Sequence, residues 1–171
     1  MDKELVKQKH GMKGRFVFGT VNANSDKEMG GGRKSWGVMM KAMRYFLDQN
    51  PDVKDTDIAW MCHTDPSDPR GLPLISMAHK FRLDNVVKFS HPEMHKTGFS
   101  EAQMAELYNC FDIFYGTSKR EGFGMTFIEA ESCGVPVIGH DFASVPELVR
   151  GHGWLCKSVA QDLNMELTPI L

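Results

Sequence analysis

Residues 117–139 read TSKREGFGMTFIEAESCGVPVIG, and this stretch decides the fold of the chain. An apolar run at residues 111–115 precedes it, and another at residues 136–138 lies near its end. Both runs are short and bounded by turn residues, as buried parallel strands are. The stretch therefore predicts a strand, a loop, a helix and a second strand.

In such a unit the loop after the first strand lies at the carboxyl edge of the sheet, where open α/β sheets bind their ligands. The helix that follows offers unpaired amide groups and the positive end of its dipole. Gly122 and Gly124 let the backbone approach a ligand closely. Glu121 falls in the loop and Glu129 about one turn into the helix, so both carboxylates could face one pocket. The stretch predicts an anion site.

The rest of the chain alternates in the same way between strand and helix patterns. Further strands are expected at residues 15–21, 58–62, 86–89 and 154–155. Further helices are expected at residues 34–49, 72–81, 100–108 and 145–149. Ser100 and Gln103 form a capping box at the start of one of these helices. This alternation predicts a Rossmann-like, doubly wound parallel α/β sheet.

Polar side chains gather after the expected strands rather than before them. They are Asn22, Asn24, Arg33 and Lys34 after the first strand, Ser90 and His91 after the third, Ser118 and Glu121 after the fourth, and His140 and Asp141 after the fifth. Because the carboxyl ends of parallel strands meet at one edge of a sheet, these residues predict a single site there.

Composition narrows the class of protein. The 171 residues suffice for one domain with a sizeable core. The net charge is −2, with 20 basic and 22 acidic side chains, so no global field favours nucleic acid or an acidic membrane. The amino-terminal residues are charged and lack an apolar leader, and no run approaches the roughly 18 apolar residues of a membrane span. We expect a cytoplasmic location.

The four cysteines, Cys62, Cys110, Cys133 and Cys156, form no C-x-x-C pair and fall in apolar or strand-like segments. This distribution suits buried thiols in a reducing compartment better than a disulfide framework or a metal site.

Three segments carry a family resemblance. They are Glu121-Gly122-Phe123-Gly124, then Glu129-Ala130, then CGVPVI at residues 133–138. Together they resemble the E-x7-E signature of retaining glycosyltransferases with the GT-B fold, family 4 in particular, also called glycosyl transferases group 1. The resemblance extends over residues 16–155. It implies a nucleotide-sugar-binding domain at residues 15–156, the C-terminal half of a GT-B fold, after a leader or linker at 1–14 and before a truncated tail at 157–171.

The resemblance also implies roles for individual residues. Glu129 would bind the ribose hydroxyls and Glu121 the hydroxyls of the transferred sugar. Arg33 and Lys34 would hold the donor's phosphates and act in catalysis with Glu121. The remaining expected donor-binding residues are Asn24, Ser90, His91, Ser118, Gly122, Phe123, Gly124, Met125 and Thr126. Two alternatives stay open. His91 is equally well a loop histidine without a binding role, and Arg33 and Lys34 could be solvated side chains at the start of a helix.

Two patterns in the sequence resemble metal-binding motifs, but neither predicts a metal site. Asp55-Thr56-Asp57 matches a D-x-D motif, but it precedes a strand and so falls at the wrong edge of the sheet. His91 and His95 have helical zinc spacing, but Pro92 follows the first and no third ligand is evident. The sequence predicts no metal and no cofactor.

The resulting hypothesis is the donor-binding domain of a metal-independent retaining glycosyltransferase that uses a UDP- or GDP-sugar. Its partners would be the nucleotide-diphosphate sugar and an N-terminal acceptor-binding domain absent from this chain. The reaction would proceed by front-face attack or through a covalent step at Glu121, and the residues leave both open. The alternatives are a free-standing nucleotide-sugar-binding module and a nucleotide-sugar epimerase of the same fold.

Overall fold

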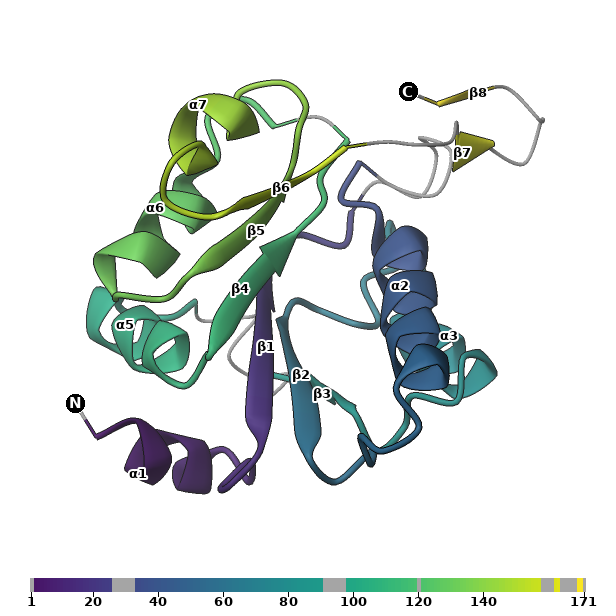
Figure 1. The fold of residues 1–171 in the computed structure, drawn as a ribbon, viewed down its shortest axis with the longest axis vertical. Coiled ribbons are helices and arrows are strands. Elements are labelled where there is room, and N and C mark those ends of the chain that lie inside the picture. Colours follow the sequence, from purple (N-terminus) through teal and green to yellow (C-terminus); the bar gives the residue numbers. More distant parts are fainter. Residues whose placement is uncertain are drawn as a thin grey trace.

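The computed structural model describes residues 2–25, 33–90, 98–119 and 121–157, and two short strands beyond them, β7 (Asp162–Leu163) and β8 (Pro169–Ile170). A six-stranded sheet forms the centre in the order β3-β2-β1-β4-β5-β6 (Figure 1). Its strands are β1 (Phe16–Val21), β2 (Ile58–His63), β3 (Val87–Phe89), β4 (Ile113–Gly116), β5 (Val137–His140) and β6 (Trp154–Cys156). Every pairing within this sheet is parallel, which confirms the predicted doubly wound α/β class.

Helices cover both faces of the sheet (Figure 1). One face carries α2 (Trp36–Gln49) and α3 (Leu74–Lys80), and the other carries α5 (Glu101–Asn109), α6 (Met125–Ser132) and α7 (Val145–Val149). The side chains between them form two apolar clusters, one on each side of the strands. A parallel sheet needs this double cover because its strands are apolar on both faces.

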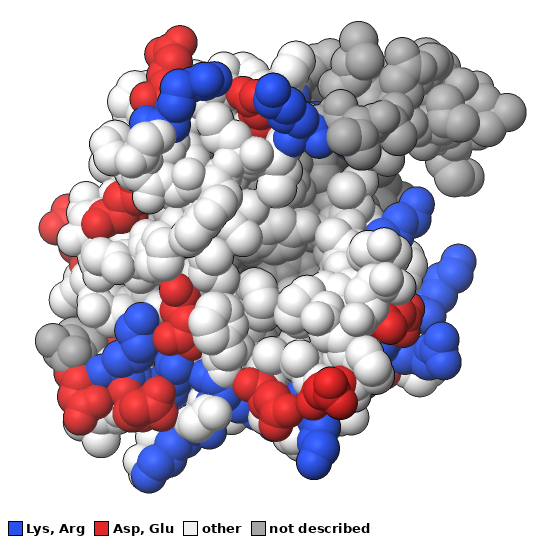
Figure 2. Space-filling view, in the orientation of Figure 1, with Lys and Arg blue, Asp and Glu red and all other residues white. Residues whose placement is uncertain are grey.

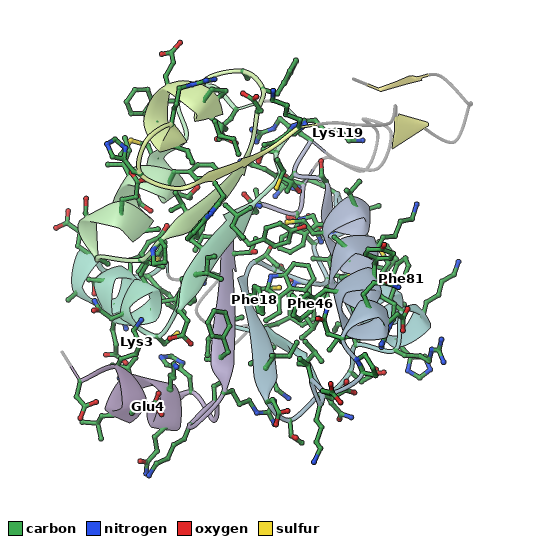
Figure 3. The ribbon with its side chains drawn as sticks, in the orientation of Figure 1. Lys3, Glu4, Phe18, Phe46, Phe81 and Lys119 are labelled. Carbon is green, nitrogen blue, oxygen red and sulfur yellow. The ribbon has the colours of Figure 1, made fainter. Side chains whose placement is uncertain are left out.

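Aromatic contacts join the sheet to α2. Phe18 of β1 meets Phe46 of α2 edge to face, with ring centroids 6.0 Å apart (Figure 3). Trp36 and Trp60 lie deeper, fully buried, at 6.2 Å. Such pairs add about 0.5–1.5 kcal/mol beyond the burial of their area. The start of α2 is thereby held against the sheet, close to the carboxyl end of β1.

The predicted capping box at the start of α5 is confirmed. The Ser100 hydroxyl accepts a hydrogen bond from the Gln103 backbone amide at 3.3 Å, and the Gln103 side chain accepts one from the Ser100 amide at 2.8 Å. Two amide groups that the helix itself leaves unpaired are thus satisfied by local sequence.

The amino-terminal segment departs from the prediction of a leader or linker at residues 1–14. It forms α1 (Lys3–Lys9), which Asp2 caps and which packs beside α5. The Lys7 ammonium lies 2.7 Å from the Asp112 carboxylate, and Met12 is fully buried. The segment is therefore part of the domain. The short apolar pattern of this segment does not indicate that it packs on the domain, because the residues that it contacts lie about 100 positions away in the chain.

Two of the four cysteines depart from the prediction of buried thiols. Cys62 and Cys110 are buried, but Cys133 is half-buried and Cys156 is exposed. Cys156 belongs to β6, the last strand of the sheet, and an edge strand is covered less completely than an inner one. Burial raises the pKa of the Cys62 and Cys110 thiols, to about 12 for Cys110.

Charged side chains of both signs are interspersed on the face shown in Figure 2, and neither sign forms a continuous field there. This agrees with the balanced composition of the whole chain. Among the described residues, no helix is both long and apolar enough to cross a membrane.

Candidate functional site

The strand order places a topological switch point between β1 and β4. The chain runs outward from β1 through β2 to β3, then returns to pair β4 with the opposite side of β1. The loops after β1 and β4 therefore lead to helices on opposite faces of the sheet and leave a crevice between them. Ligands of doubly wound sheets bind in this crevice.

A pocket of about 470 Å³ lies at this crevice. The loop after β1 contributes residues 21–25 with Arg33 and Lys34, the loop after β2 contributes residues 63–65 with Asp68 and Arg70, and the β4–α6 segment contributes Glu121 and Thr126. The structure thus gathers five of the expected catalytic and donor-binding residues: Asn24, Arg33, Lys34, Glu121 and Thr126.

Lys34 and Glu121 form an ion pair across this pocket. Their Nζ and Oε2 atoms are 2.6 Å apart, and the side chains are only 9% and 13% exposed. Both backbones are held in place: the Lys119 amide donates to the Arg33 carbonyl at 2.8 Å, and the Ser144 hydroxyl donates to the Glu121 carbonyl at 3.1 Å (Lys119 is labelled in Figure 3). The sequence predicted both residues at one edge of the sheet but not their pairing.

Asn24 uses its side chain to hold a neighbouring loop. Its Nδ2 atom donates to the carbonyls of Asp65 and Leu72 at 3.1 and 2.9 Å, and its Oδ1 atom accepts from the Leu72 amide at 2.9 Å. Gly71 lies so close that a Cβ there would collide with Asn24. These hydrogen bonds of Asn24 use both amide hydrogens and one of the two acceptor positions of Oδ1, and so give the side chain a structural role. The predicted contact of Asn24 with the donor stays a prediction.

The loop that Asn24 holds carries two pocket residues that the sequence analysis missed, Asp68 and Arg70. Arg70 donates two side-chain hydrogen bonds to the Asp68 carboxylate, one from Nε at 3.1 Å and one from Nη2 at 2.9 Å. These bonds lower the pKa of Asp68 and raise that of Arg70. The available signal was the run DPSDPRG at residues 65–71, polar and turn-rich directly after a strand.

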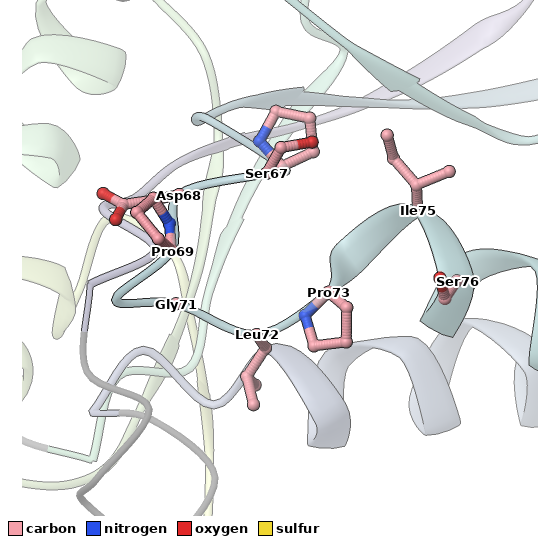
Figure 4. A pocket seen from close by; sticks show the side chains of 9 residues that line it. Ser67, Asp68, Pro69, Gly71, Leu72, Pro73, Ile75 and Ser76 are labelled. Carbon is pink, nitrogen blue, oxygen red and sulfur yellow. The ribbon is translucent and has the colours of Figure 1, made fainter.

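The same loop borders a second pocket, of about 490 Å³, shown in Figure 4. Its lining includes Pro69, Pro73 and Ile75 but no basic side chain. A site for a polyanion needs cations or converging amide groups. The first pocket is therefore the candidate site.

Two polar groups in the candidate pocket lack a hydrogen-bond partner within the described ranges. They are Nδ2 of Asn22 and the hydroxyl of Thr64, both on buried side chains that line the pocket. Buried polar groups are nearly always hydrogen-bonded, and an unpaired one calls for an explanation such as a bound ligand or water. Asn22 and Thr64 therefore offer two polar groups in this pocket to a ligand or to water.

The glycine-containing turn begins α6. Gly124 adopts φ +92° as the residue before the helix, a conformation that favours glycine, while Phe123 and Met125 are exposed. Glu129, one turn into α6, is absent from the pocket lining; its Oε2 atom accepts a 2.6 Å hydrogen bond from Tyr108. The predicted ribose contact of Glu129 stays a prediction.

The other predicted residues are placed as follows. Ser90 is buried and its hydroxyl lies 3.0 Å from Nδ1 of His63, a pocket residue. Ser118 is buried after β4. His91 lies outside the described residues. Within the described residues, no group of three or more His, Cys, Asp or Glu side chains is arranged to hold a metal ion. Asp57 pairs its carbonyl with Phe16 at the amino end of β1, so the D-x-D segment lies at the opposite edge, as predicted.

A doubly wound parallel sheet with a cation-bearing pocket at its switch point is the arrangement in which α/β domains bind nucleotides. The model of the family described as "Glycosyl transferases group 1" matches residues 32–168. The chain belongs to this family.

The relatives agree with this assignment. A D-inositol 3-phosphate glycosyltransferase of Streptomyces bingchenggensis is 25% identical over 122 residues, which cover 70% of this chain and 26% of the relative. The serotype-specific mannosyltransferase WbdA of Escherichia coli is 33% identical over 87 residues, covering 50% of this chain and 10% of WbdA. The chain thus spans about a quarter of the inositol-phosphate enzyme that it matches.

Solved structures show the same fold. HepE of Anabaena, crystallised with UDP and glucose, superimposes with a TM-score of 0.69 at 22% identity, covering 91% of this chain and 38% of HepE. The C-terminal domain of the group 1 glycosyltransferase LpcC of Francisella tularensis superimposes with a TM-score of 0.65 at 20% identity, covering 91% and 74%. The chain therefore has the fold of a GT-B glycosyltransferase domain.

Proposed function

We propose that this chain is the donor-binding domain of a retaining glycosyltransferase that transfers a sugar from a UDP- or GDP-sugar to an acceptor hydroxyl. The single observation that carries the proposal is the pocket at the β1/β4 switch point, where Lys34 and Glu121 meet from loops on either side. One supplies a charge for phosphate and the other an acceptor for sugar hydroxyls. Family membership and the fold shared with HepE, which was crystallised with UDP, support the same reading.

The basic pair would receive the diphosphate. Arg33 and Lys34 both line the pocket directly before α2. A guanidinium offers a flat fork of donors and an ammonium offers a point charge, and both suit phosphate oxygens. As the bond to the leaving diphosphate breaks, charge grows on its oxygens, and fixed cations stabilise that charge. We assign this task to Arg33 and Lys34 in place of a metal ion.

The loop after β4 and the start of α6 would receive the sugar and the ribose. Glu121 would accept hydrogen bonds from the sugar hydroxyls, and Glu129 from the ribose. The amide groups from Gly122 to Thr126 would face the sugar and the diphosphate, as amides at a helix start commonly do. Ser90, His91 and Ser118 would complete the site on the side of the base. The orphan groups of Asn22 and Thr64 agree with a ligand rich in hydroxyl and phosphate oxygens.

In the reaction itself, the acceptor oxygen would bond to the anomeric carbon while the bond from that carbon to the diphosphate breaks. The acceptor's proton would pass to a donor phosphate oxygen on the same face, which retains the configuration. Such a transfer needs both substrates aligned in a closed cleft, and alignment alone is worth about 7–11 kcal/mol. We assign the acceptor to a second domain, because the relatives are several times longer than the matched region.

Thermal unfolding with a ligand panel tests the proposal. UDP, GDP, ADP and their sugar esters are added at millimolar concentration, each with and without EDTA. A ligand at 100 times its dissociation constant adds about 2.7 kcal/mol of stability, a shift of several degrees for a domain of this size. We expect one nucleotide family to raise the Tm equally with and without EDTA. The proposal fails if no nucleotide shifts the Tm, and its metal-independent part fails if EDTA abolishes the shift.

Transfer assays test the catalytic part of the proposal. The domain alone should bind the donor but transfer no sugar. When it is joined to the acceptor domain of its natural enzyme, it should transfer the sugar with retention of configuration, which NMR of the product measures directly. A domain that binds nucleotide sugars but supports no transfer in any context would instead be a binding module.

A further inference from the structure

Two cations of the candidate pocket are already paired with carboxylates that line the same pocket. Lys34 contacts Glu121 at 2.6 Å, and Arg70 contacts Asp68 at 2.9 Å through Nη2. The two pairs differ in their surroundings. The Arg70 side chain is 75% exposed, whereas Lys34 and Glu121 are both largely shielded from water. The buried pair is therefore the one that an entering anion must disturb.

A phosphate and the Glu121 carboxylate compete for the same ammonium group. In a partly buried position, water and salt screen the repulsion between two anions much less than at the surface. A phosphate that approaches Lys34 must therefore displace the carboxylate or lie beside it at an electrostatic cost. The Glu121 backbone is held beside the pocket, because its carbonyl accepts a hydrogen bond from Ser144, so the carboxylate stays within reach of Lys34.

A free nucleoside diphosphate and a nucleotide sugar differ at this point. The terminal phosphate of the free diphosphate can ionise a second time, with a pKa of about 6, and so carries extra negative charge at neutral pH. In the nucleotide sugar, a neutral ring bearing hydroxyl groups replaces that charge. A hydroxyl donates a hydrogen bond to a carboxylate, whereas an ionised phosphate oxygen only accepts. The Glu121 carboxylate therefore favours the sugar and opposes the bare phosphate.

We propose that Glu121 is a specificity-determining residue, and that its pairing with Lys34 makes the pocket prefer a nucleotide sugar to the free nucleoside diphosphate. The proposal rests on the proposed donor site and deepens it. When a nucleotide sugar binds, its hydroxyls satisfy Glu121 while Lys34 turns to the diphosphate. After transfer, the sugar has left and Glu121 pairs with Lys34 again. The nucleoside diphosphate product then binds the pocket more weakly.

Calorimetry tests the proposed preference by measuring ligand binding to four forms of the chain: the wild type, Glu121→Gln, Lys34→Met and the double variant. The probes are inorganic pyrophosphate, UDP and UDP-glucose, with GDP and GDP-mannose in parallel. Glu101→Gln is the control, because it removes the same charge from an exposed position at the start of α5. Thermal unfolding confirms that each variant folds.

We expect Glu121→Gln to bind pyrophosphate and the free diphosphate about tenfold more tightly than the wild type, since a charge-assisted hydrogen bond of Lys34 becomes available to the ligand. The same variant should bind the nucleotide sugar more weakly. The gain should vanish in the Lys34→Met background, because the two residues act as a pair. Glu101→Gln should change neither affinity.

The inference is overturned if Glu121→Gln leaves diphosphate affinity unchanged or lowers it, or if the gain persists without Lys34. Pyrophosphate separates this failure from failure of the proposed function. If no nucleotide binds, the proposed function falls, yet a Lys34-dependent gain in pyrophosphate binding still supports the pairing argument. If pyrophosphate binds neither the wild type nor Glu121→Gln, the inference falls too.

Discussion

The Tyr108 hydroxyl donates a 2.6 Å hydrogen bond to Oε2 of Glu129 and so joins the end of α5 to α6. Tyr108 is fully buried against Phe111 and Phe114, with ring centroids 5.6 and 6.1 Å away. Burial, the hydrogen bond and the charge of Glu129 all raise the pKa of this tyrosine, so the hydroxyl stays protonated and donates at any physiological pH. Tyr108 therefore fixes where one oxygen of the Glu129 carboxylate lies.

Tyr108→Phe removes this bond while preserving the packing of the ring. If Glu129 binds the ribose, we expect nucleoside and nucleoside diphosphate to bind about tenfold more weakly, the low end of what a hydrogen bond to a charged group contributes. Pyrophosphate, which has no ribose, should bind as before. Calorimetry with uridine, UDP and pyrophosphate makes the comparison, and Tyr115→Phe controls for loss of the hydroxyl of a half-buried tyrosine elsewhere. Equal weakening for pyrophosphate would mean that Tyr108 acts on the whole domain.

Arg33 and Lys34 should contribute to the binding of the phosphates and not to that of the nucleoside. Arg33→Ala and Lys34→Ala are each expected to weaken the binding of the UDP- or GDP-sugar by about 1.5–3 kcal/mol, since each removes a charged contact to its diphosphate. The affinity for the corresponding nucleoside should change little. The exposed Lys13→Ala serves as the control. A parallel loss of affinity for the nucleoside and the nucleotide sugar would show that the substitutions act on folding rather than on phosphate binding.

Asn24 should act through the loop that it holds. Asn24→Ala removes three hydrogen bonds to the backbone of Asp65 and Leu72 and should lower the free energy of unfolding by about 1–3 kcal/mol. Urea denaturation measures this, with the exposed Asn85→Ala as control. Amide hydrogen exchange should rise within residues 65–72 before other segments. Unchanged stability would show that the side-chain bonds of Asn24 do not hold the loop.

The contact between α1 and the sheet should contribute measurably to the free energy of unfolding. Lys7→Met leaves Asp112 without its closest cation and should cost about 3 kcal/mol, the low end for a buried pair, because Lys3 still contacts Asp112 at 3.4 Å. Denaturation of the variant, with the exposed Lys13→Met as control, gives the difference. A loss no larger than that of the control would show that α1 is held by apolar contacts alone.

The pair also predicts a pH dependence. Burial lowers the pKa of Lys7, but hydrogen bonds to Asp112 and Glu4 outweigh it and raise the pKa above the ordinary value of 10.5. A group whose pKa rises on folding stabilises the fold fully below its unfolded pKa. The difference between wild type and Lys7→Met should therefore be constant from neutral pH to about pH 10 and shrink at higher pH. A difference that grows with alkaline pH would contradict this assignment.

Much of the fold could be predicted because its signals are local. The apolar spacing of α2, the capping box of α5 and the short apolar runs of β2 and β5 each lie within a few residues of the structure that they determine. The position of the site followed from the same reasoning, since polar residues after parallel strands must gather at one edge. The docking of α1 was missed because its partners, Phe111 and Asp112, are remote in sequence.

The sequence by itself determined the class of fold, the edge of the sheet that bears the candidate site and the residue types available there. Only the tertiary structure decided which of those residues meet: Lys34 with Glu121, Tyr108 with Glu129, and Asn24 with the backbone of Asp65 and Leu72. The reason is physical. Periodicity and turn chemistry act between near neighbours in the chain, whereas these contacts join residues 21 to 87 positions apart, and the packing of helices on the sheet brings them within hydrogen-bonding distance.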